Sequence, residues 1–177
     1  MFYGVYVLWD KRLDFLKEVL VAPLYRSTIF LGKVLGGITD AILQVIIIMI
    51  LAPFFGIHLG WNLIPIFIFL VVLITGLVSV GLAIGSIVES PEAFGLINSM
   101  INFPLFFLSG ALFPLTDLPK WLTFFTRINP VTYGVDAMRT LMLGMGTFNL
   151  TLDFIVLTAF AVIMVIIGTY AFSKMKI

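Results

Sequence analysis

The sequence predicts an all-α protein, specifically a polytopic membrane helix bundle. Of its 177 residues, 62% are hydrophobic and only 11% are charged, whereas a soluble domain is about 45–50% apolar and about 25% charged. Four apolar runs are also long enough to cross the hydrocarbon core of a bilayer, which takes about 20 helical residues. These four predicted spans are residues 34–55, 63–86, 94–113 and 152–172.

The first nine residues are also apolar but are too few to span a bilayer. They precede the charged residues Asp10, Lys11 and Arg12, which is the reverse of a signal peptide. We therefore expect the last turns of a membrane helix here, so that the bundle has four full transmembrane helices plus a partial one. A short anchor lying in the membrane interface is the alternative.

Residues 10–33 form a short amphipathic segment that carries half of the basic residues. Leu13, Leu16 and Leu20 recur at helical spacing, and Lys17 and Glu18 lie on another face. Pro23 ends or bends this helix. The pattern predicts a helix over residues 10–22 that lies in the membrane surface and turns its charged side toward water or a protein. A plain interfacial connector fits the same pattern.

Polar residues inside the predicted spans are candidates for a translocation path. Asp40 and Gln44 are one helical turn apart and share a face. Asn98, Asn102 and Ser109 fall within about 40° of one another on the third span. Polar groups at this depth usually face a bundle interior or a cavity. Hydrogen bonding between helices, or contact of Asp40 with the headgroups, remains open.

The last two spans are separated by residues 114–150, which have the pattern of two short helices. Apolar residues repeat at helical spacing around Trp121, and Asn129-Pro130 interrupts the pattern. In the second helix, Asp136 and Arg139 can pair at i, i+3. We expect two half-buried, re-entrant helices. Their candidate residues are Pro114, Pro119, Trp121, Asn129, Pro130, Asp136 and Arg139.

Helix contacts and boundaries give two smaller predictions. Gly81 and Gly85 form a GxxxG pair, which favours close packing of two helices. Ser90-Pro91 has the pattern of a helix start, with Ser90 as the cap and Pro91 at the first helical position.

The distribution of basic residues predicts the orientation. An even number of spans puts both ends on one side, which then holds seven Lys and Arg residues against three on the other. The seven are Lys11, Arg12, Lys17, Arg26, Lys33, Lys174 and Lys176, and the three are Lys120, Arg127 and Arg139. By the positive-inside rule both ends are cytoplasmic and residues 114–150 are outside.

Several function classes are excluded by composition. A net charge of +1 supplies no basic field for nucleic acid. The chain has no cysteine, and its one histidine, His58, cannot build a histidine-rich metal site alone. We expect no catalytic residue and no metal site.

Three segments near the carboxy-terminal half carry a family resemblance. They read SGALFPL (residues 109–115), LPKWL (118–122) and NPVTYGVDAMR (129–139), and WDKRLDFLKEVLVAPLYRSTIFLGK (9–33) precedes them. In this order and spacing the chain resembles type-2 ABC transporter permeases, the membrane subunits of ATP-binding-cassette exporters, most closely the daunorubicin-resistance branch.

The resemblance implies a subunit of six membrane helices in the cytoplasmic membrane, working as a homo- or heterodimer with two ATPase subunits. Residues 10–22 would be the coupling helix that seats in the ATPase, and residues 114–150 would cap the exit side. The residues implied in ATPase coupling are Asp10, Arg12, Leu13, Leu16, Lys17, Glu18, Pro23 and Arg26.

The implied function is efflux of an amphiphilic drug, a lipid or a polysaccharide, as in drug resistance. The chain has no Walker A sequence, so ATP and Mg would be bound by the partner ATPase and not by this chain. It matches the family only from the end of the second membrane helix onward. A non-catalytic membrane scaffold, an ion pathway or a non-functional fragment is therefore the alternative.

Overall fold

The computed structural model describes residues 1–13, 24–56, 62–112 and 119–175, and every regular element in these ranges is a helix. The all-α prediction is confirmed there. The elements are η1 (Phe2–Gly4), α1 (Val5–Arg12), α3 (Arg26–Leu51), η2 (Ala52–Phe55), α4 (Leu63–Ile87), α5 (Pro91–Phe107), α6 (Lys120–Ile128), α7 (Pro130–Leu143) and α8 (Leu150–Ser173).

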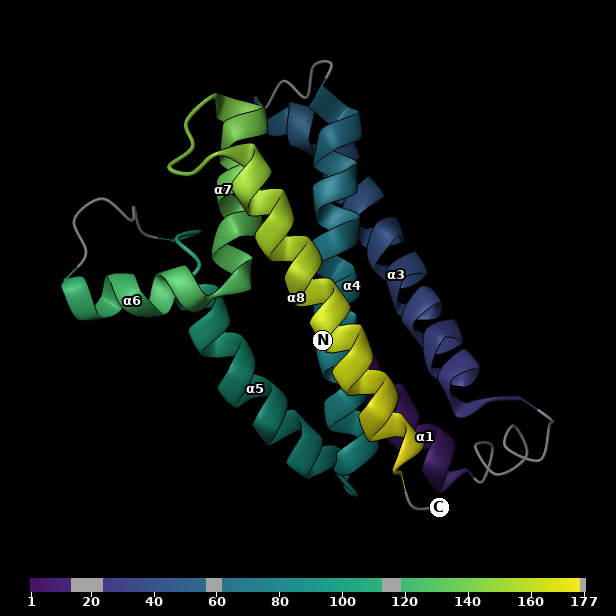
Figure 1. Ribbon diagram of the computed structural model, residues 1–177. Helices are drawn as coiled ribbons and strands as arrows, with labels where there is room; N and C mark the ends of the chain where they lie inside the picture. Colours follow the sequence, from purple (N-terminus) through teal and green to yellow (C-terminus); the bar gives the residue numbers. More distant parts are fainter. Residues whose placement is uncertain (14–23, 57–61, 113–118, 176–177) are drawn as a thin grey trace.

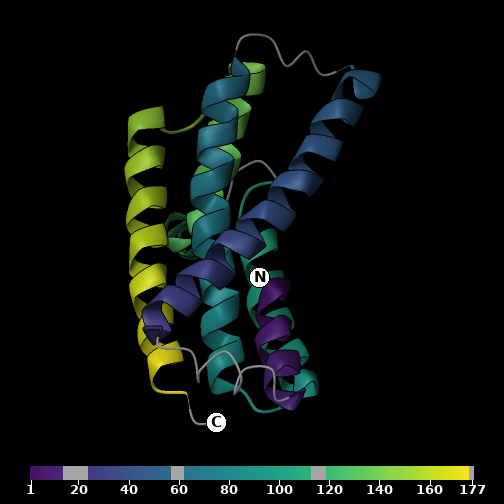
Figure 2. The ribbon, with the colours of Figure 1, turned by 90° about the vertical axis from the view of Figure 1, so that its right-hand side faces the viewer.

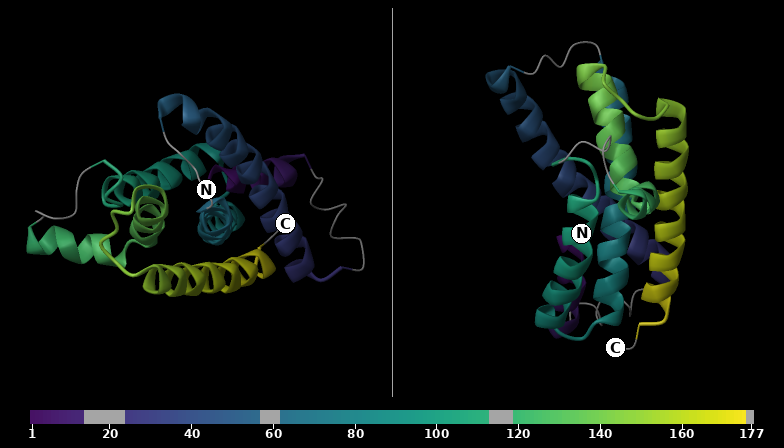
Figure 3. Two further views of the ribbon diagram at one scale, coloured as in Figure 1. Left: turned by 90° about the horizontal axis from the view of Figure 1, so that it is seen from above. Right: turned by 90° about the vertical axis from the view of Figure 1, so that its left-hand side faces the viewer.

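Helix α4 is the centre of the bundle (Figures 1 and 3). It packs most extensively on α8 and also touches α3, α7, α1 and α5. One buried apolar cluster joins α1, α3, α4 and α8 and includes Phe30, Leu82 and Phe172. A second joins α4, α7 and α8 around Tyr133 and Leu157. Figure 2 shows α3 crossing α4 at an angle, so that the two helices separate toward the end of α3.

Three described helices are long and apolar enough to cross a membrane: Arg26–Phe55, Leu63–Ile87 and Leu150–Ser173. Three of the four predicted spans coincide with these candidates, which are identified by length and composition. The first begins at residue 26 instead of 34, so part of the predicted surface segment continues directly into the spanning helix.

The fourth predicted span, residues 94–113, is wrong in its extent. Helix α5 ends at Phe107, and its 17 residues are at the short end of the range of about 17–25 residues for a crossing. A turn follows in which Gly110 has φ 77°, a left-handed conformation that glycine adopts without strain. The sequence stays largely apolar through this turn, so hydropathy could not predict the end of the helix. The start of α5 is confirmed, because the Ser90 side chain accepts a hydrogen bond from the Ala93 amide at 3.1 Å.

The two predicted short helices between the last spans are α6 and α7, and they meet at Asn129 as expected. Helix α6 projects sideways from the bundle (Figure 1) and exposes Trp121 and Phe124. Helix α7 packs on α4 and α8. Its end is held by Asn62 at the start of α4, which donates to the Leu141 carbonyl at 2.7 Å.

Candidate functional site

Five helix ends meet at one end of the bundle, which we call the Lys11 end. They are the carboxy-terminal ends of α1, α4 and α8, the beginning of α5 and the first turns of α3. In Figure 2 these ends lie together at the bottom of the view. The described residues on either side of 14–23, a range that contains most of the predicted coupling helix (residues 10–22), belong to this assembly.

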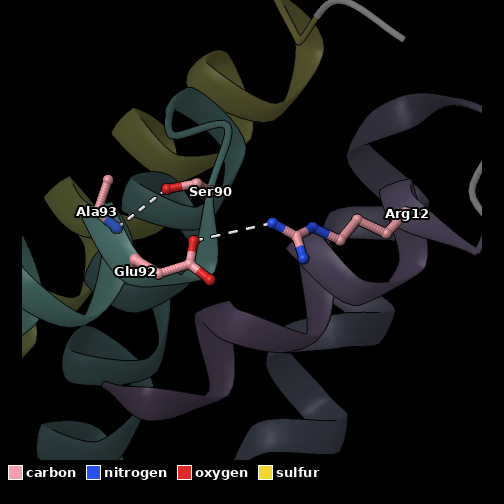
Figure 4. Close-up of polar contacts among 4 residues, drawn as sticks. All are labelled: Arg12, Ser90, Glu92 and Ala93. Carbon is pink, nitrogen blue, oxygen red and sulfur yellow. Dashed lines mark hydrogen bonds and ion pairs between the residues drawn. The ribbon is translucent and has the colours of Figure 1, made fainter.

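The end of α1 is tied to three neighbouring helices by consecutive charged residues. Asp10 forms an ion pair with Lys33 of α3. The Lys11 ammonium donates to the Ser86 carbonyl of α4 at 3.0 Å. Figure 4 shows the third tie, an ion pair of 3.8 Å between Arg12 and Glu92 at the start of α5. Together these contacts fix where the chain leaves α1.

The beginning of α3 is tied to α8. The Arg26 guanidinium donates to the carbonyls of Ser173 at 3.0 Å and Met175 at 2.9 Å. Carbonyls at a helix end have no partner within the helix, and a cation there also interacts favourably with the helix dipole. Arg26 therefore joins the beginning of α3, which follows residues 14–23 in the sequence, to the end of α8.

Two groups at the Lys11 end have shifted pKa values. Burial lowers the pKa of Lys11, because removal from water disfavours the ammonium form, and Glu89 acts in the opposite direction. The pKa of Glu92 is lowered by hydrogen bonds from its own backbone amide and from Ser90, and then by Arg12. The start of α5 thus holds a carboxylate in its charged form.

The predicted coupling residues fall into three groups. Asp10, Arg12 and Arg26 make the contacts described above. Leu13 is 73% exposed. Leu16, Lys17, Glu18 and Pro23 lie outside the described residues. Sequence reasoning missed Lys11, Lys33 and Glu92 as members of this site, because their partners are distant in sequence.

The predicted path residues line two separate cavities. Asp40 and Gln44 line a cavity of about 390 Å³, and Asn102 lines one of about 400 Å³. Both cavities also touch Met1 and Phe2, so the path residues of α3 and α5 flank the first residues of the chain. The structure therefore brings these side chains near the first residues of the chain, but it does not place them in one cavity.

The other two predicted path residues are buried. Neither the amide nitrogen nor the amide oxygen of Asn98 has a hydrogen-bond partner among the described residues. Ser109 instead forms the turn after α5, donating to the Phe106 carbonyl at 2.6 Å and accepting from the Ala111 amide at 3.2 Å.

At the end of α5, the NPVTYGVDAMR segment satisfies carbonyls that the helix leaves without partners. Three of its side chains donate to backbone oxygens of α5 and the following turn. The bonds run from Asn129 to the Leu105 oxygen at 2.7 Å, from Thr132 to the Leu108 oxygen at 3.2 Å and from Arg139 to the Gly110 oxygen at 2.6 Å. A helix end in an apolar environment needs such donors. The segment therefore fixes α7 against α5.

The same segment also holds the connection to α8. The Asp136 carboxylate, 3% exposed, accepts hydrogen bonds from the amides of Thr147 and Phe148, each at 2.8 Å. The predicted Asp136–Arg139 pair is wrong, since the two side chains bind different backbone groups. The hydrogen bonds to Asp136 therefore join α7 to the chain that leads into α8.

The remaining outer residues have structural positions. Asn129 caps α7 by accepting from the Val131 amide at 3.0 Å, with Pro130 at the first helical position. Pro119 occupies the position before the first residue of α6, and Trp121 of α6 is exposed. Pro114 lies outside the described residues, as does His58. Within the ranges that the structure describes, no three His, Asp or Glu side chains gather in a way that could hold a metal ion.

An all-helical bundle with three spanning candidates, whose helix ends are joined by charged and polar contacts, defines a polytopic membrane protein. Residues 1–143 match the family described as ABC-2 type transporter, and the chain belongs to this family. No Walker A sequence occurs among the 177 residues, so the chain corresponds to the membrane permease part of such a transporter, without an ATPase domain in this sequence.

Among three similar curated proteins, two are transport permeases by name. The putative transport permease ycf38 of Cyanophora paradoxa is 32% identical over 138 residues, covering 76% of this chain and 48% of the relative. The inner membrane transport permease YadH of Escherichia coli K12 is 27% identical over 150 residues, covering 83% of this chain and 57% of the relative. Nodulation protein J of Rhizobium meliloti is 33% identical over 101 residues, covering 56% and 38%.

The chain thus spans about half the length of these relatives. No solved structure matches it at a significant level.

Proposed function

We propose that this chain is the carboxy-terminal part of a permease subunit of an ATP-binding-cassette exporter, working in the cytoplasmic membrane. The subunit forms a homo- or heterodimer and takes its energy from two ATPase subunits, which bind ATP and Mg. Its substrate is an amphiphilic molecule such as a drug, a lipid or a polysaccharide.

The observation that carries this proposal is the set of contacts at the Lys11 end. Helix α1 ends with Asp10, Lys11 and Arg12 and α3 begins at Arg26, so residues 14–23 lie in the sequence between these two attachment points. Both attachment points are tied to other helices by ion pairs and hydrogen bonds. A force applied to residues 10–22 by an ATPase would therefore act on α3, α4, α5 and α8 together.

Helix α5 offers a route from this end to the opposite one. Glu92 at its start pairs with Arg12, and the carbonyls at its end bind Asn129 and Thr132. At about 1.5 Å per residue, its 17 residues span about 25 Å. We assign α5 as the fourth crossing, completed on the outer side by the re-entrant α6 and α7.

The positive-inside rule supports the orientation, with the Lys11 end in the cytoplasm and α7 outside. The cavities lined by Asp40, Gln44 and Asn102 then lie along the proposed translocation path. The buried amide of Asn98 adds a group with free hydrogen-bonding capacity on α5. Polar groups inside membrane bundles commonly mark such paths.

The first test is purification of the tagged full-length protein from native membranes in mild detergent, followed by an ATPase assay and identification of bound proteins. We expect an ATP-binding-cassette subunit at about one copy per permease. The double variant Leu16→Asp/Glu18→Lys should lose it. If no such ATPase accompanies the correctly inserted protein, the exporter proposal is wrong.

The second test separates binding of the ATPase from transmission of its movement. Asp10→Lys and Lys33→Asp each place two like charges at the α1–α3 contact, so each should uncouple ATP hydrolysis from export while the ATPase stays bound. The double variant restores opposite charges and should recover coupling. Equal coupling in all four proteins would show that this ion pair transmits nothing.

A further inference from the structure

A cavity of about 470 Å³ opens at the Lys11 end between the last turns of α4 and α8. Two lysines face it from different elements, Lys11 from α1 and Lys174 from the end of α8. One carboxylate, Glu89, is also in its lining. The three charged side chains of the lining therefore have a net charge of +1 when all are ionised.

The α8 side of the cavity changes character along the helix. Ile167, Tyr170 and Lys174 follow one another at helical spacing and share a face. Tyr170 is 65% exposed, and the Lys174 ammonium lies 5.6 Å from the centre of its ring. This order, apolar then aromatic then cationic, matches the change from hydrocarbon to headgroups to water at a membrane surface.

The opposite side of the cavity also places an apolar residue next to a cation. Ile87, at the end of α4, is 72% exposed. Beside it, the Lys11 ammonium is held 3.0 Å from the Ser86 carbonyl. Lys11 is thereby held by α4, whereas the side chain of Lys174 is exposed.

We propose that this cavity binds the headgroup of an anionic phospholipid. The phosphate lies between the ammonium groups of Lys11 and Lys174 and accepts from the Tyr170 hydroxyl. The acyl chains lie along Ile87 and Ile167. Cationic pockets between membrane helices suit such headgroups, and the apolar walls favour a lipid over a free phosphate because only a lipid covers them.

The bound lipid joins the end of α1 to the end of α8, next to the segment proposed to bind the ATPase. The lipid proposal rests on the proposed orientation, in which the Lys11 end faces the anionic lipids of the cytoplasmic side. It does not depend on an ATPase or on transport, so the two proposals can fail separately.

The test is a titration of the full-length protein in neutral detergent with phosphatidylglycerol or phosphatidylcholine, with bound lipids counted by native mass spectrometry. We expect the first phosphatidylglycerol to bind more tightly than phosphatidylcholine. Lys174→Gln should weaken phosphatidylglycerol binding by about fivefold, the effect of one lysine near an anionic surface. Glu89→Gln should strengthen it, a gain that a misfolded protein could not show.

The control is Arg127→Gln, which removes an exposed cation of α6 that lies outside the cavity lining. It should leave the affinity for phosphatidylglycerol unchanged. Equal binding of the two lipids, or no effect of Lys174→Gln and Glu89→Gln, would overturn the proposal. Displacement of the lipid by millimolar glycerol phosphate would assign the cavity to a soluble anion instead.

Discussion

The contact between Asn129 and the end of α5 allows a quantitative prediction. Asn129→Ala removes two hydrogen bonds, one to the Leu105 carbonyl at 2.7 Å and one from the Val131 amide at 3.0 Å. A buried carbonyl left without a donor costs about 1–3 kcal/mol. Loss of a helix cap costs about 1 kcal/mol. We therefore expect a loss of about 3 kcal/mol in the free energy of unfolding.

The measurement is reversible unfolding by SDS in mixed micelles, followed by the fluorescence of the three tryptophans. Asn129→Ser separates the two bonds, because serine caps a helix about as well as asparagine but is too short to reach Leu105. It should be about 1 kcal/mol more stable than Asn129→Ala. Asn102→Ser is the matched control and should change stability by less than about 0.5 kcal/mol. An Asn129→Ala variant as stable as the original would refute the assignment of this bond as a support of α5.

Two further predictions concern the Lys11 end. At Gly85 an added methyl group would meet the backbone carbonyl of Gly4, so Gly85→Ala should push α1 away from α4 and lower the free energy of unfolding. The control is Gly32→Ala, where the added methyl group meets open space; it should raise the free energy of unfolding by up to about 1 kcal/mol through helix propensity. Changes of the same sign in both variants would contradict this reasoning. Because Glu92 has a pKa below its usual 4.5, its contribution is present above pH 4.5 and is lost as the pH falls through its pKa in the folded protein. Titration by carbon NMR should show this lowered pKa, with Ser90→Ala raising it, and an unshifted carboxyl would count against the capped geometry.

The long helices could be predicted from sequence because their signal is local. Lipid-facing and buried positions are both apolar, so an unbroken apolar run marks a helix whatever its neighbours are. The predicted spans 63–86 and 152–172 correspond to α4 (Leu63–Ile87) and α8 (Leu150–Ser173). Ser90 and Pro91 likewise mark the start of α5 by local chemistry.

The end of α5 could not be predicted in the same way. Its sequence remains apolar through Leu108 and Ala111, whereas the backbone turns at Gly110. The donors that make this turn acceptable are Asn129, Thr132 and Arg139, more than twenty residues farther along. The same limit applies to Lys11, which binds a carbonyl 75 residues away, and to Asp136, whose spacing to Arg139 permits a pair that the fold does not use.

In each hydrogen bond that holds α5 to α7, the amino-acid type matters at only one of the two residues. Asn129, Thr132 and Arg139 contribute side chains, but Leu105, Leu108 and Gly110 contribute backbone oxygens that every amino acid possesses. Substitution at Leu105 leaves its bond in place, whereas substitution at Asn129 abolishes it. We therefore expect the sequence of residues 129–139 to vary little among relatives, whereas these bonds place no constraint on the amino-acid types at the end of α5. Correlated substitutions would not reveal this contact, although it fixes one helix against the other.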